Sequence, residues 1–373
     1  MKKIKVLHFP IRNTNGGITR SAMKYWRFID KNKFQFDFAT CSAKIDFENE
    51  ILRAGCKVHY ISCYAEANPE QFYEEMKNIL LEGKYDAVHL NTSWWRGTLA
   101  EQAAKEIGVK VILVHARNTY IDINDEEKRQ TELLNHEKCK REFDSNLATH
   151  YMACSRKAAD FLFGPQIPRE KIIIFHNALD VKRYSFDFST RNIMRKKLDL
   201  GDRYVIGNVG RFVYQKNHKF LIDCFYEVVK EIPTAVLMLI GGGELEQEIR
   251  KQIAEYGIDD KVLFIGESDC VEMYLQAMDV FAFPTRFEGL GNVLIEAQTA
   301  GLKCITSTNV PEETHITDNI TYLPLEISQW VSEIMKYVEG YSRQNLDEQI
   351  SEAGYDITKE IKVLERIYSK ALQ

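Results

Sequence analysis

The chain has 373 residues, of which 45% are hydrophobic and 28% are charged, and its formal net charge is −5. These values are typical of a globular protein with room for two domains, and the acidic balance argues against nucleic acid as a partner, because the phosphate backbone attracts basic proteins. The eight cysteines include no C-x-x-C pair, so we expect neither a zinc site nor a disulfide framework.

The chain starts directly with a short strand pattern, and none of its apolar stretches is long enough to cross a bilayer. We therefore expect a cytoplasmic protein whose membrane contact, if any, is peripheral and at the inner face. A basic segment at 128–141 offers one way to approach anionic lipid headgroups, but its interspersed glutamates favour a solvated face.

Short apolar runs alternate with longer helical patterns along the chain. The first series of expected strands covers 5–9, 36–41, 57–61, 87–90, 110–115, 150–153 and 171–175. The second series covers 204–209, 235–240, 261–265, 280–283 and 303–307. Alternation of this kind favours parallel sheets covered by helices, and two series favour two doubly wound α/β domains.

Domain boundaries are expected where this alternation stops. Periodicity is lost over 180–202, so we place a first domain at 1–184 and a second at 185–345. The strongly helical segment 346–373 follows the second series.

The most informative segment follows the strand expected at 280–283 and combines a glycine loop with a helix start. Free backbone N–H groups and the helix dipole favour an anion at such a place. Glu288 lies in the loop and Glu296 about a turn into the helix, and carboxylates can accept hydrogen bonds from sugar hydroxyls. The segment predicts a site for a sugar joined to phosphate; the alternative is two solvated glutamates.

A second motif follows the strand expected at 204–209. Arg211 and Lys216 come after Gly-Asn-Val-Gly, at the carboxyl end of that strand. Ligands of open α/β sheets bind at this edge, so both cations would lie near Glu288 if the two strands are neighbours. A guanidinium can bind two phosphate oxygens at once and an ammonium adds a mobile charge, which together suit a leaving pyrophosphate.

These two motifs resemble the donor-site signature of the retaining glycosyltransferases of family 4. The resemblance implies the GT-B fold, in which two facing Rossmann-like domains hold the active site in the cleft between them. It also implies that segment 346–373 returns to the first domain; a helix that caps the second domain alone is the alternative.

The resemblance also implies roles for individual residues. Glu288 would contact the transferred sugar and Glu296 the ribose, while the glycine loop at Gly16 and Gly17 would close over the donor phosphates. The implied nucleotide-sugar-binding set is Gly16, Gly17, Arg211, Lys216, Gly242, Glu288, Gly289, Leu290, Gly291 and Glu296, and the implied catalytic set is His115, Glu288, Arg211 and Lys216.

On the acceptor side, His115 ends the strand expected at 110–115. Family members often carry His-x-His-Asn here, whereas this chain has Arg117 in place of the second His, which adds a cation beside the presumed acceptor site. His115 is either an acceptor-side residue or a structural histidine. The pair Trp94 and Trp95, followed by Arg96, lines a sugar or lipid groove or belongs to the core.

The resemblance implies a retaining transferase that moves a hexose from a nucleotide sugar, most plausibly a UDP-sugar, to a hydroxyl of a glycan or lipid-linked glycan in capsule or exopolysaccharide assembly. No cofactor and no metal are expected, because protein cations would neutralise the pyrophosphate. The alternatives are a nucleotide-sugar sensor or inactive partner subunit, and an epimerase of similar architecture. A glycoside hydrolase would also use paired carboxylates, but it would leave Arg211 and Lys216 without a purpose.

Overall fold

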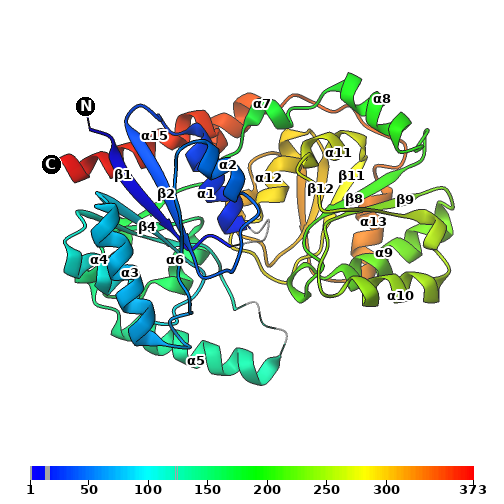
Figure 1. The fold of residues 1–373 in the computed structure, drawn as a ribbon. Coiled ribbons are helices and arrows are strands. Elements are labelled where there is room, and N and C mark those ends of the chain that lie inside the picture. Colours follow the sequence, from blue (N-terminus) through cyan, green and yellow to red (C-terminus); the bar gives the residue numbers. More distant parts are fainter. Residues whose placement is uncertain (1, 13–16, 122, 124) are drawn as a thin grey trace. The chain divides into compact units, whose positions relative to one another are not determined.

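A computed structural model describes residues 2–12, 17–121, 123 and 125–373 (Figure 1). The chain divides into two compact units. The first consists of Met1–Ala178 together with Ile357–Gln373, and the second of Leu179–Asp356. Both crossings between units occur at one place, because the Leu179 N–H donates to the Tyr355 carbonyl at 2.8 Å and Leu179 forms a parallel bridge with Asp356. The sequence placed these boundaries at 184/185 and 345/346.

The first unit contains a seven-stranded sheet in the order β3-β2-β1-β4-β5-β6-β7, with every pair parallel. Its central strands are buried along nearly their whole length, as expected for a sheet covered on both faces. The strands are β1 (Ile4–Phe9), β2 (Phe34–Thr40), β3 (Val58–Tyr60), β4 (Ala87–Thr92), β5 (Val111–Ala116), β6 (His150–Ala153) and β7 (Ile172–Ile174).

Local capping explains where several helices of this unit begin. Asn68 accepts a hydrogen bond from the Gln71 N–H ahead of α3, and Ser155 accepts one from the Ala158 N–H ahead of α6. The helices are α1 (Gly17–Phe28), α2 (Glu48–Arg53), α3 (Pro69–Gly83), α4 (Leu99–Ile107), α5 (Glu126–Glu142), α6 (Arg156–Leu162) and α15 (Ile357–Ser369).

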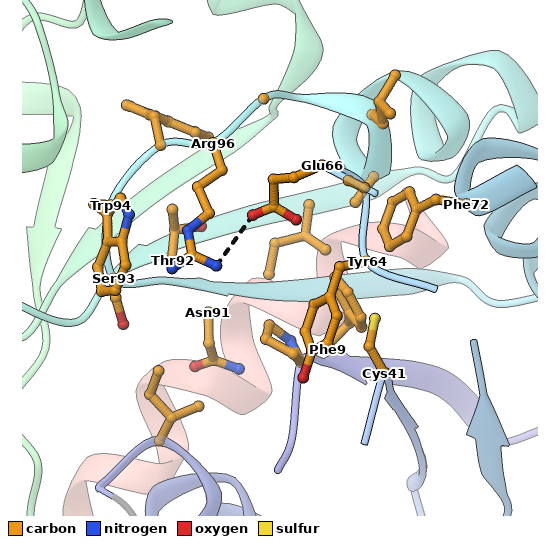
Figure 2. Close-up of a pocket in the computed structure, with 18 of the residues that line it drawn as sticks. Phe9, Cys41, Tyr64, Glu66, Phe72, Asn91, Thr92, Ser93, Trp94 and Arg96 are labelled. Carbon is orange, nitrogen blue, oxygen red and sulfur yellow. Dashed lines mark hydrogen bonds and ion pairs between the residues drawn. The ribbon is translucent and has the colours of Figure 1, made fainter. Parts of the chain in front are cut away.

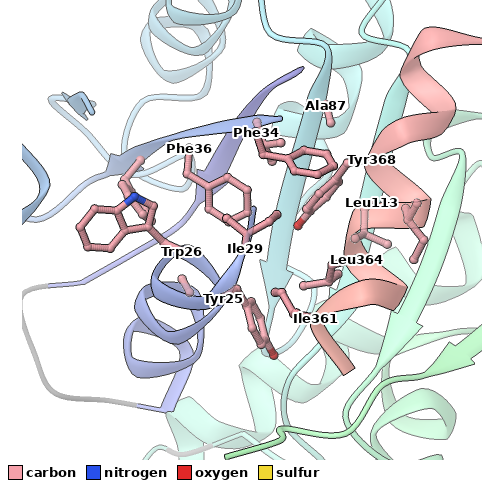
Figure 3. Close-up of a cluster of buried hydrophobic side chains, with 14 of the residues drawn as sticks. Tyr25, Trp26, Ile29, Phe34, Phe36, Ala87, Leu113, Ile361, Leu364 and Tyr368 are labelled. Atoms are coloured by element: carbon pink, nitrogen blue, oxygen red, sulfur yellow. The ribbon is translucent and has the colours of Figure 1, made fainter. Parts of the chain in front are cut away.

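Helix α15 belongs to the core of the first unit although it comes from the far end of the sequence. It contacts α1 and β1, and its Leu364 and Tyr368 are fully buried beside Phe36 (Figure 3). The apolar face of this amphipathic helix is therefore covered by the first sheet and not by the second.

The second unit contains a six-stranded parallel sheet in the order β10-β9-β8-β11-β12-β13. Two apolar clusters cover its two faces: Phe281 belongs to one and Ala282 to the other, because successive side chains of a strand point to opposite faces. The strands are β8 (Val205–Val209), β9 (Val236–Ile240), β10 (Val262–Gly266), β11 (Val280–Phe283), β12 (Lys303–Ser307) and β13 (Ile320–Leu323). The helices are α7 (Val181–Tyr184), α8 (Phe188–Lys197), α9 (His218–Glu231), α10 (Glu246–Tyr256), α11 (Val271–Ala277), α12 (Asn292–Thr299), α13 (Ile327–Met335) and α14 (Asp347–Ile350).

The predicted class, two doubly wound units with parallel sheets, is confirmed for each unit. Three details differ from the sequence-based expectation. Strand β13 was not predicted. Helix α8 lies within 180–202, where the sequence shows no apolar periodicity. The reason is that Met194 is the one buried residue of this helix. The helical segment at 346–373 is interrupted at Gly354, whose φ of 83° breaks the helical path before α15.

Because α15 completes the first unit's core, Leu364→Ala should lower the free energy of unfolding by about 2–5 kcal/mol, the usual cost of emptying a buried leucine site. Chemical denaturation followed by circular dichroism measures this change. The exposed Lys359→Ala on the same helix is the matched control and should stay within about 0.5 kcal/mol of the parent. Equal stability of both variants would contradict the placement of α15.

Candidate functional site

The strand order of the second unit reverses direction between β8 and β11. These strands are neighbours, with Val280 paired to Ile206, yet the chain leaves β8 toward β9 on one side and leaves β11 toward β12 on the other. The connections therefore run to opposite sides of this point, and ligands of open α/β sheets bind at the carboxyl edge there. The adjacency required by the sequence argument is present, so Arg211, Lys216 and Glu288 follow neighbouring strands.

Hydrogen bonds hold the loops after β8 and β11 together. The Gln215 side chain donates from Nε2 to the Phe287 carbonyl at 2.8 Å, and the Arg286 N–H donates to the Gln215 carbonyl at 2.8 Å. Arg286 also donates from Nη2 to Asn217 Oδ1 at 2.8 Å. The two loops are thus one connected structure, which fixes the side chains they carry.

An ion pair lies at the centre of this structure. Lys216 Nζ donates to Glu288 Oε1, and Thr285 Oγ1 lies 3.1 Å from the same carboxylate oxygen. The ammonium is also 4.9 Å from the ring centroid of Phe283, within range of a cation–π interaction. Only 16% of the Lys216 side chain and 8% of the Glu288 side chain are exposed. The sequence analysis assigned these residues to phosphate and sugar separately and did not predict their pairing.

His218 borders this pair, and the sequence analysis gave it no role. Neither ring nitrogen has a hydrogen-bond partner among the described residues. The ring packs edge-on against Phe212, with the two ring centroids 4.7 Å apart. Burial, and then the nearby Lys216 charge, lower the pKa of His218 to about 3. The imidazole is therefore neutral at physiological pH and adds no charge beside the ion pair.

Two glycines shape the backbone around the site. Gly241 has a φ of 141°, and a Cβ there would lie 2.1 Å from the Gly210 carbonyl oxygen, so a side chain would push the turn after β9 away from the loop after β8. Gly291 has a φ of 87° and immediately precedes α12. In the same turn after β9, the carbonyl of the next residue, Gly242, accepts a hydrogen bond from the Phe212 N–H at 2.9 Å.

The remaining predicted residues have these positions. Arg211 is exposed, Gly289 and Leu290 are buried in the loop before α12, and Glu296 is half-buried in α12. In the first unit, Gly17 is the first residue of α1, and Gly16 lies outside the described residues. Their roles toward a nucleotide sugar stay predictions.

His115 is fully buried at the end of β5, in register with Asn91 of β4. Its Nδ1 lies 3.0 Å from His89 Nε2, and Arg117 Nη1 lies 3.1 Å from its Nε2. Burial, and then the Arg117 charge, hold the pKa of His115 well below its usual value. The ring is neutral and engaged on both nitrogens, which the sequence did not indicate.

In the first unit, a pocket of about 160 Å³ opens at the carboxyl edge of the sheet (Figure 2). Trp94 lines it, stacked 4.4 Å from the Arg96 guanidinium, and Arg96 pairs with Glu66 at 3.1 Å. Trp95 is 1% exposed and donates from Nε1 to the Leu162 carbonyl at 2.8 Å. Of the two alternatives for the tryptophan pair, a groove lining and a core position, each therefore holds for one residue: Trp94 faces the pocket, and Trp95 is mainly a core residue.

Two buried polar groups belong to the pocket lining. Asn91 Nδ2 has no hydrogen-bond partner within the described ranges, although the residue is only 4% exposed. Burial raises the pKa of Glu101 to about 7. Aromatic walls from Phe9, Tyr64 and Phe72 complete a lining in which few polar groups stand among apolar surfaces, as is typical of small-ligand sites.

No group of three or more His, Cys, Asp or Glu residues that could hold a metal ion occurs among the residues the structure describes. Across the same ranges, no helix has both the length and the apolar character needed to span a bilayer.

The Lys216–Glu288 pair generates a first prediction. Glu288→Gln should destabilise the protein by about 3 kcal/mol, because removing one partner leaves the other charge buried. Lys216→Met in the same chain should recover part of that loss. Denaturation of both single variants and the double variant measures the coupling. Glu227→Gln, which breaks the exposed pair with Lys230, should cost less than about 1 kcal/mol. Simple additivity at 216 and 288 would contradict the pairing.

Glu101 generates a second prediction. Its folded-state pKa is raised, so the stability from the neutral carboxyl is present below the unfolded value and is lost as pH rises through about 7. Glu101→Gln should therefore gain stability relative to the parent between pH 5 and pH 8, by at most about 3 kcal/mol. Thermal melts across that range test this expectation, with the exposed Glu82→Gln as control. A difference that does not change with pH would show that Glu101 titrates normally.

Comparisons with known proteins agree with this architecture. The family model "Glycosyltransferase Family 4" matches residues 15–183, and "Glycosyl transferases group 1" matches residues 190–356. The putative glycosyltransferase EpsF of Bacillus subtilis is 30% identical over 98% of this chain and 96% of its own length. The capsular polysaccharide biosynthesis glycosyltransferase CapH of Staphylococcus aureus is 25% identical over 99% of this chain and 100% of its own.

Among solved structures, Anabaena HepE in complex with UDP superposes with a TM-score of 0.75 at 17% identity, covering 99% of this chain and 100% of that chain. The expected GT-B fold class is confirmed by this likeness and by the two matching family models. With two family models side by side and a relative at 30% identity along almost its whole length, the chain belongs to the family 4 glycosyltransferases and is a glycosyltransferase of the GT-B type.

Proposed function

We propose that this glycosyltransferase moves a hexose from a UDP-sugar to a hydroxyl of a glycan or lipid-linked glycan, with retention of configuration, in capsular or exopolysaccharide biosynthesis. The observation that carries the proposal is the Lys216–Glu288 pair at the carboxyl ends of the neighbouring strands β8 and β11, with Arg211 on the same edge. The similarity to CapH, a capsular polysaccharide biosynthesis glycosyltransferase, supports the pathway, and the UDP in the HepE structure supports the donor.

Donor binding follows from the charges at this edge. A diphosphate that reaches Lys216 competes with Glu288 for the ammonium, since phosphate oxygens form strong charge-assisted hydrogen bonds. Released from Lys216, the Glu288 carboxylate can accept from a sugar hydroxyl. Arg211 and the start of α12 add positive potential for the leaving diphosphate, and Glu296 in α12 accepts from the ribose.

Retention requires the acceptor to attack on the face that the diphosphate leaves. In this mechanism the bond from the anomeric carbon to the phosphate oxygen breaks, the acceptor hydroxyl oxygen forms the new bond, and the leaving phosphate oxygen takes the hydroxyl proton. The protein's part is to hold the leaving group and stabilise its charge through Arg211 and Lys216.

The pocket of the first unit is our candidate for the acceptor sugar. Trp94 offers a flat apolar face, and Asn91 Nδ2 and Glu101 offer polar groups for hydroxyls. If the acceptor is lipid-linked, the enzyme would work at a membrane surface as a peripheral protein.

Transfer itself tests the proposal. Radiolabelled UDP-hexoses incubated with the protein and a bacterial lipid-linked glycan extract should give labelled glycan with the donor's anomeric configuration by NMR. Donor conversion without an acceptor would favour an epimerase. Tight donor binding with no transfer to any extract would favour a sensor or partner subunit.

A further prediction concerns the cations. Arg211→Ala and Lys216→Ala should each weaken UDP binding by about 1.5–3 kcal/mol, the usual worth of a hydrogen bond to a charged group. Isothermal titration calorimetry with UDP and GDP measures the loss and compares the two bases. Lys230→Ala, an exposed change on α9, is the control. Unchanged affinity in both variants would remove these residues from the donor site.

Metal dependence gives another prediction. Transfer activity in excess EDTA should stay within about twofold of the untreated enzyme, because Arg211, Lys216 and the α12 start already supply positive potential. Loss of activity that magnesium or manganese restores would point to a metal site and contradict this account of the donor charge.

A further inference from the structure

Four buried side chains form a continuous chain of hydrogen bonds beneath the carboxyl edge of the first sheet. His115 Nδ1 lies 3.0 Å from His89 Nε2, and His89 Nδ1 lies 2.7 Å from the Tyr368 hydroxyl. The same hydroxyl lies 3.4 Å from His8 Nε2. All four residues are fully buried, and Tyr368 comes from α15, where it packs beside Phe34 and Phe36 (Figure 3).

Arg117 ends this chain at the edge of the sheet. Its Nη1 lies 3.1 Å from Nε2 and 3.4 Å from Nδ1 of His115, so the guanidinium packs against the face of the ring. Nη2 donates to Ser21 Oγ at 2.7 Å, and Nη1 donates to the Tyr25 hydroxyl at 3.4 Å. Both partners belong to α1, so α1 and β5 together hold the cation.

The Arg117 charge has no acidic partner among the described residues. Its contacts there are with hydroxyls and an imidazole, and burial, with the Arg117 charge as a smaller cause, lowers the pKa of His8, His89 and His115. The three histidines are therefore neutral, and each carries one ring proton. A half-buried cation that is held in place without a counter-charge is suited to receive an anion.

The cation also decides where the ring protons lie. A guanidinium is always positively charged, so the ring proton of His115 is favoured on Nδ1, the nitrogen farther from it, and the electron pair on Nε2, the nearer one. The His115 proton then lies on Nδ1 and is donated to His89 Nε2. This leaves the His89 proton on Nδ1, donated to the Tyr368 oxygen. Tyr368 in turn donates to His8 Nε2, which places the His8 proton on Nδ1, a nitrogen with no partner in the described part of the chain.

We propose that Arg117 is a substrate-binding cation of the first unit that takes an anionic oxygen, phosphate or carboxylate, and that His115 is its positioning residue, held as the Nδ1–H tautomer by His89, Tyr368 and His8. The ligand part rests on the proposed function, since it names what a substrate offers to this edge. The proton order does not depend on that function.

Nitrogen-15 NMR of histidine-labelled protein tests the proton order directly. His115, His89 and His8 should each show a protonated Nδ1 and a bare Nε2, unchanged from pH 5 to pH 9. His136 is an internal control with the opposite tautomer: its Nδ1 accepts from the Trp95 N–H at 3.0 Å, and its Nε2 faces the Phe161 carbonyl at 3.0 Å. A protonated Nε2 on His115 would overturn the proposed order.

Arg117→Gln tests the cause. Without the cation, the His115 signals should begin to titrate or show both tautomers, while those of His136 should not change. Signals that are the same with and without Arg117 would mean that the cation does not set the tautomer, and would overturn the positioning role.

Anion titration tests the ligand. In an Arg211→Ala/Lys216→Ala background, which removes the second unit's phosphate-binding cations, inorganic phosphate or glucuronate should shift the His115 signals saturably. The same titration of the Arg117→Gln protein should give no shift. If neither anion moves the signals up to about 50 mM, Arg117 is not an anion site, whereas saturable binding here combined with no glycosyl transfer by the unmodified protein would retain this site and reject the proposed function.

Discussion

The Lys216–Glu288 ion pair is the interaction on which the candidate site of the second unit depends. It joins the loops that follow the neighbouring strands β8 and β11, and both of its groups are mostly buried. A buried pair of this kind contributes little net stability, because desolvation offsets attraction, but losing one member is costly. In the function we propose, its value lies in position, because a cation for phosphate and a carboxylate for hydroxyls lie side by side.

Much of this arrangement could be predicted because it depends on short segments of sequence. The strand series, the Gly-Asn-Val-Gly motif before Arg211 and the glycine loop around Glu288 each depend on neighbouring residues, and parallel topology brings their ends to one edge. The pairing of Lys216 with Glu288 could not be read in this way, since the two residues are 72 positions apart and only the strand order makes them neighbours. Helix α8 escaped prediction for a different reason, because a helix that buries only Met194 shows no apolar stripe.

The first unit differs more from what the sequence suggested. His115 ends its strand as expected, yet the structure buries the ring and connects it to His89 and to Tyr368, which comes from the other end of the chain. No local pattern could reveal a contact between residues so far apart in sequence. Arg117 is the half-buried charge at the end of this row of neutral rings, and after burial its charge is a further cause of the lowered pKa of all three histidines.

The position of α15 bears on how the protein is made. Translation proceeds from the N-terminus, so the first unit's sheet emerges from the ribosome well before the helix that completes its core, and all of Leu179–Asp356 is synthesised in between. During that interval the surface destined for Leu364 and Tyr368 stays uncovered, and the second unit is the first to have its full sequence available. The first unit is thus the first to be started and the last to be completed, and while it is nascent it is the part most in need of protection from aggregation.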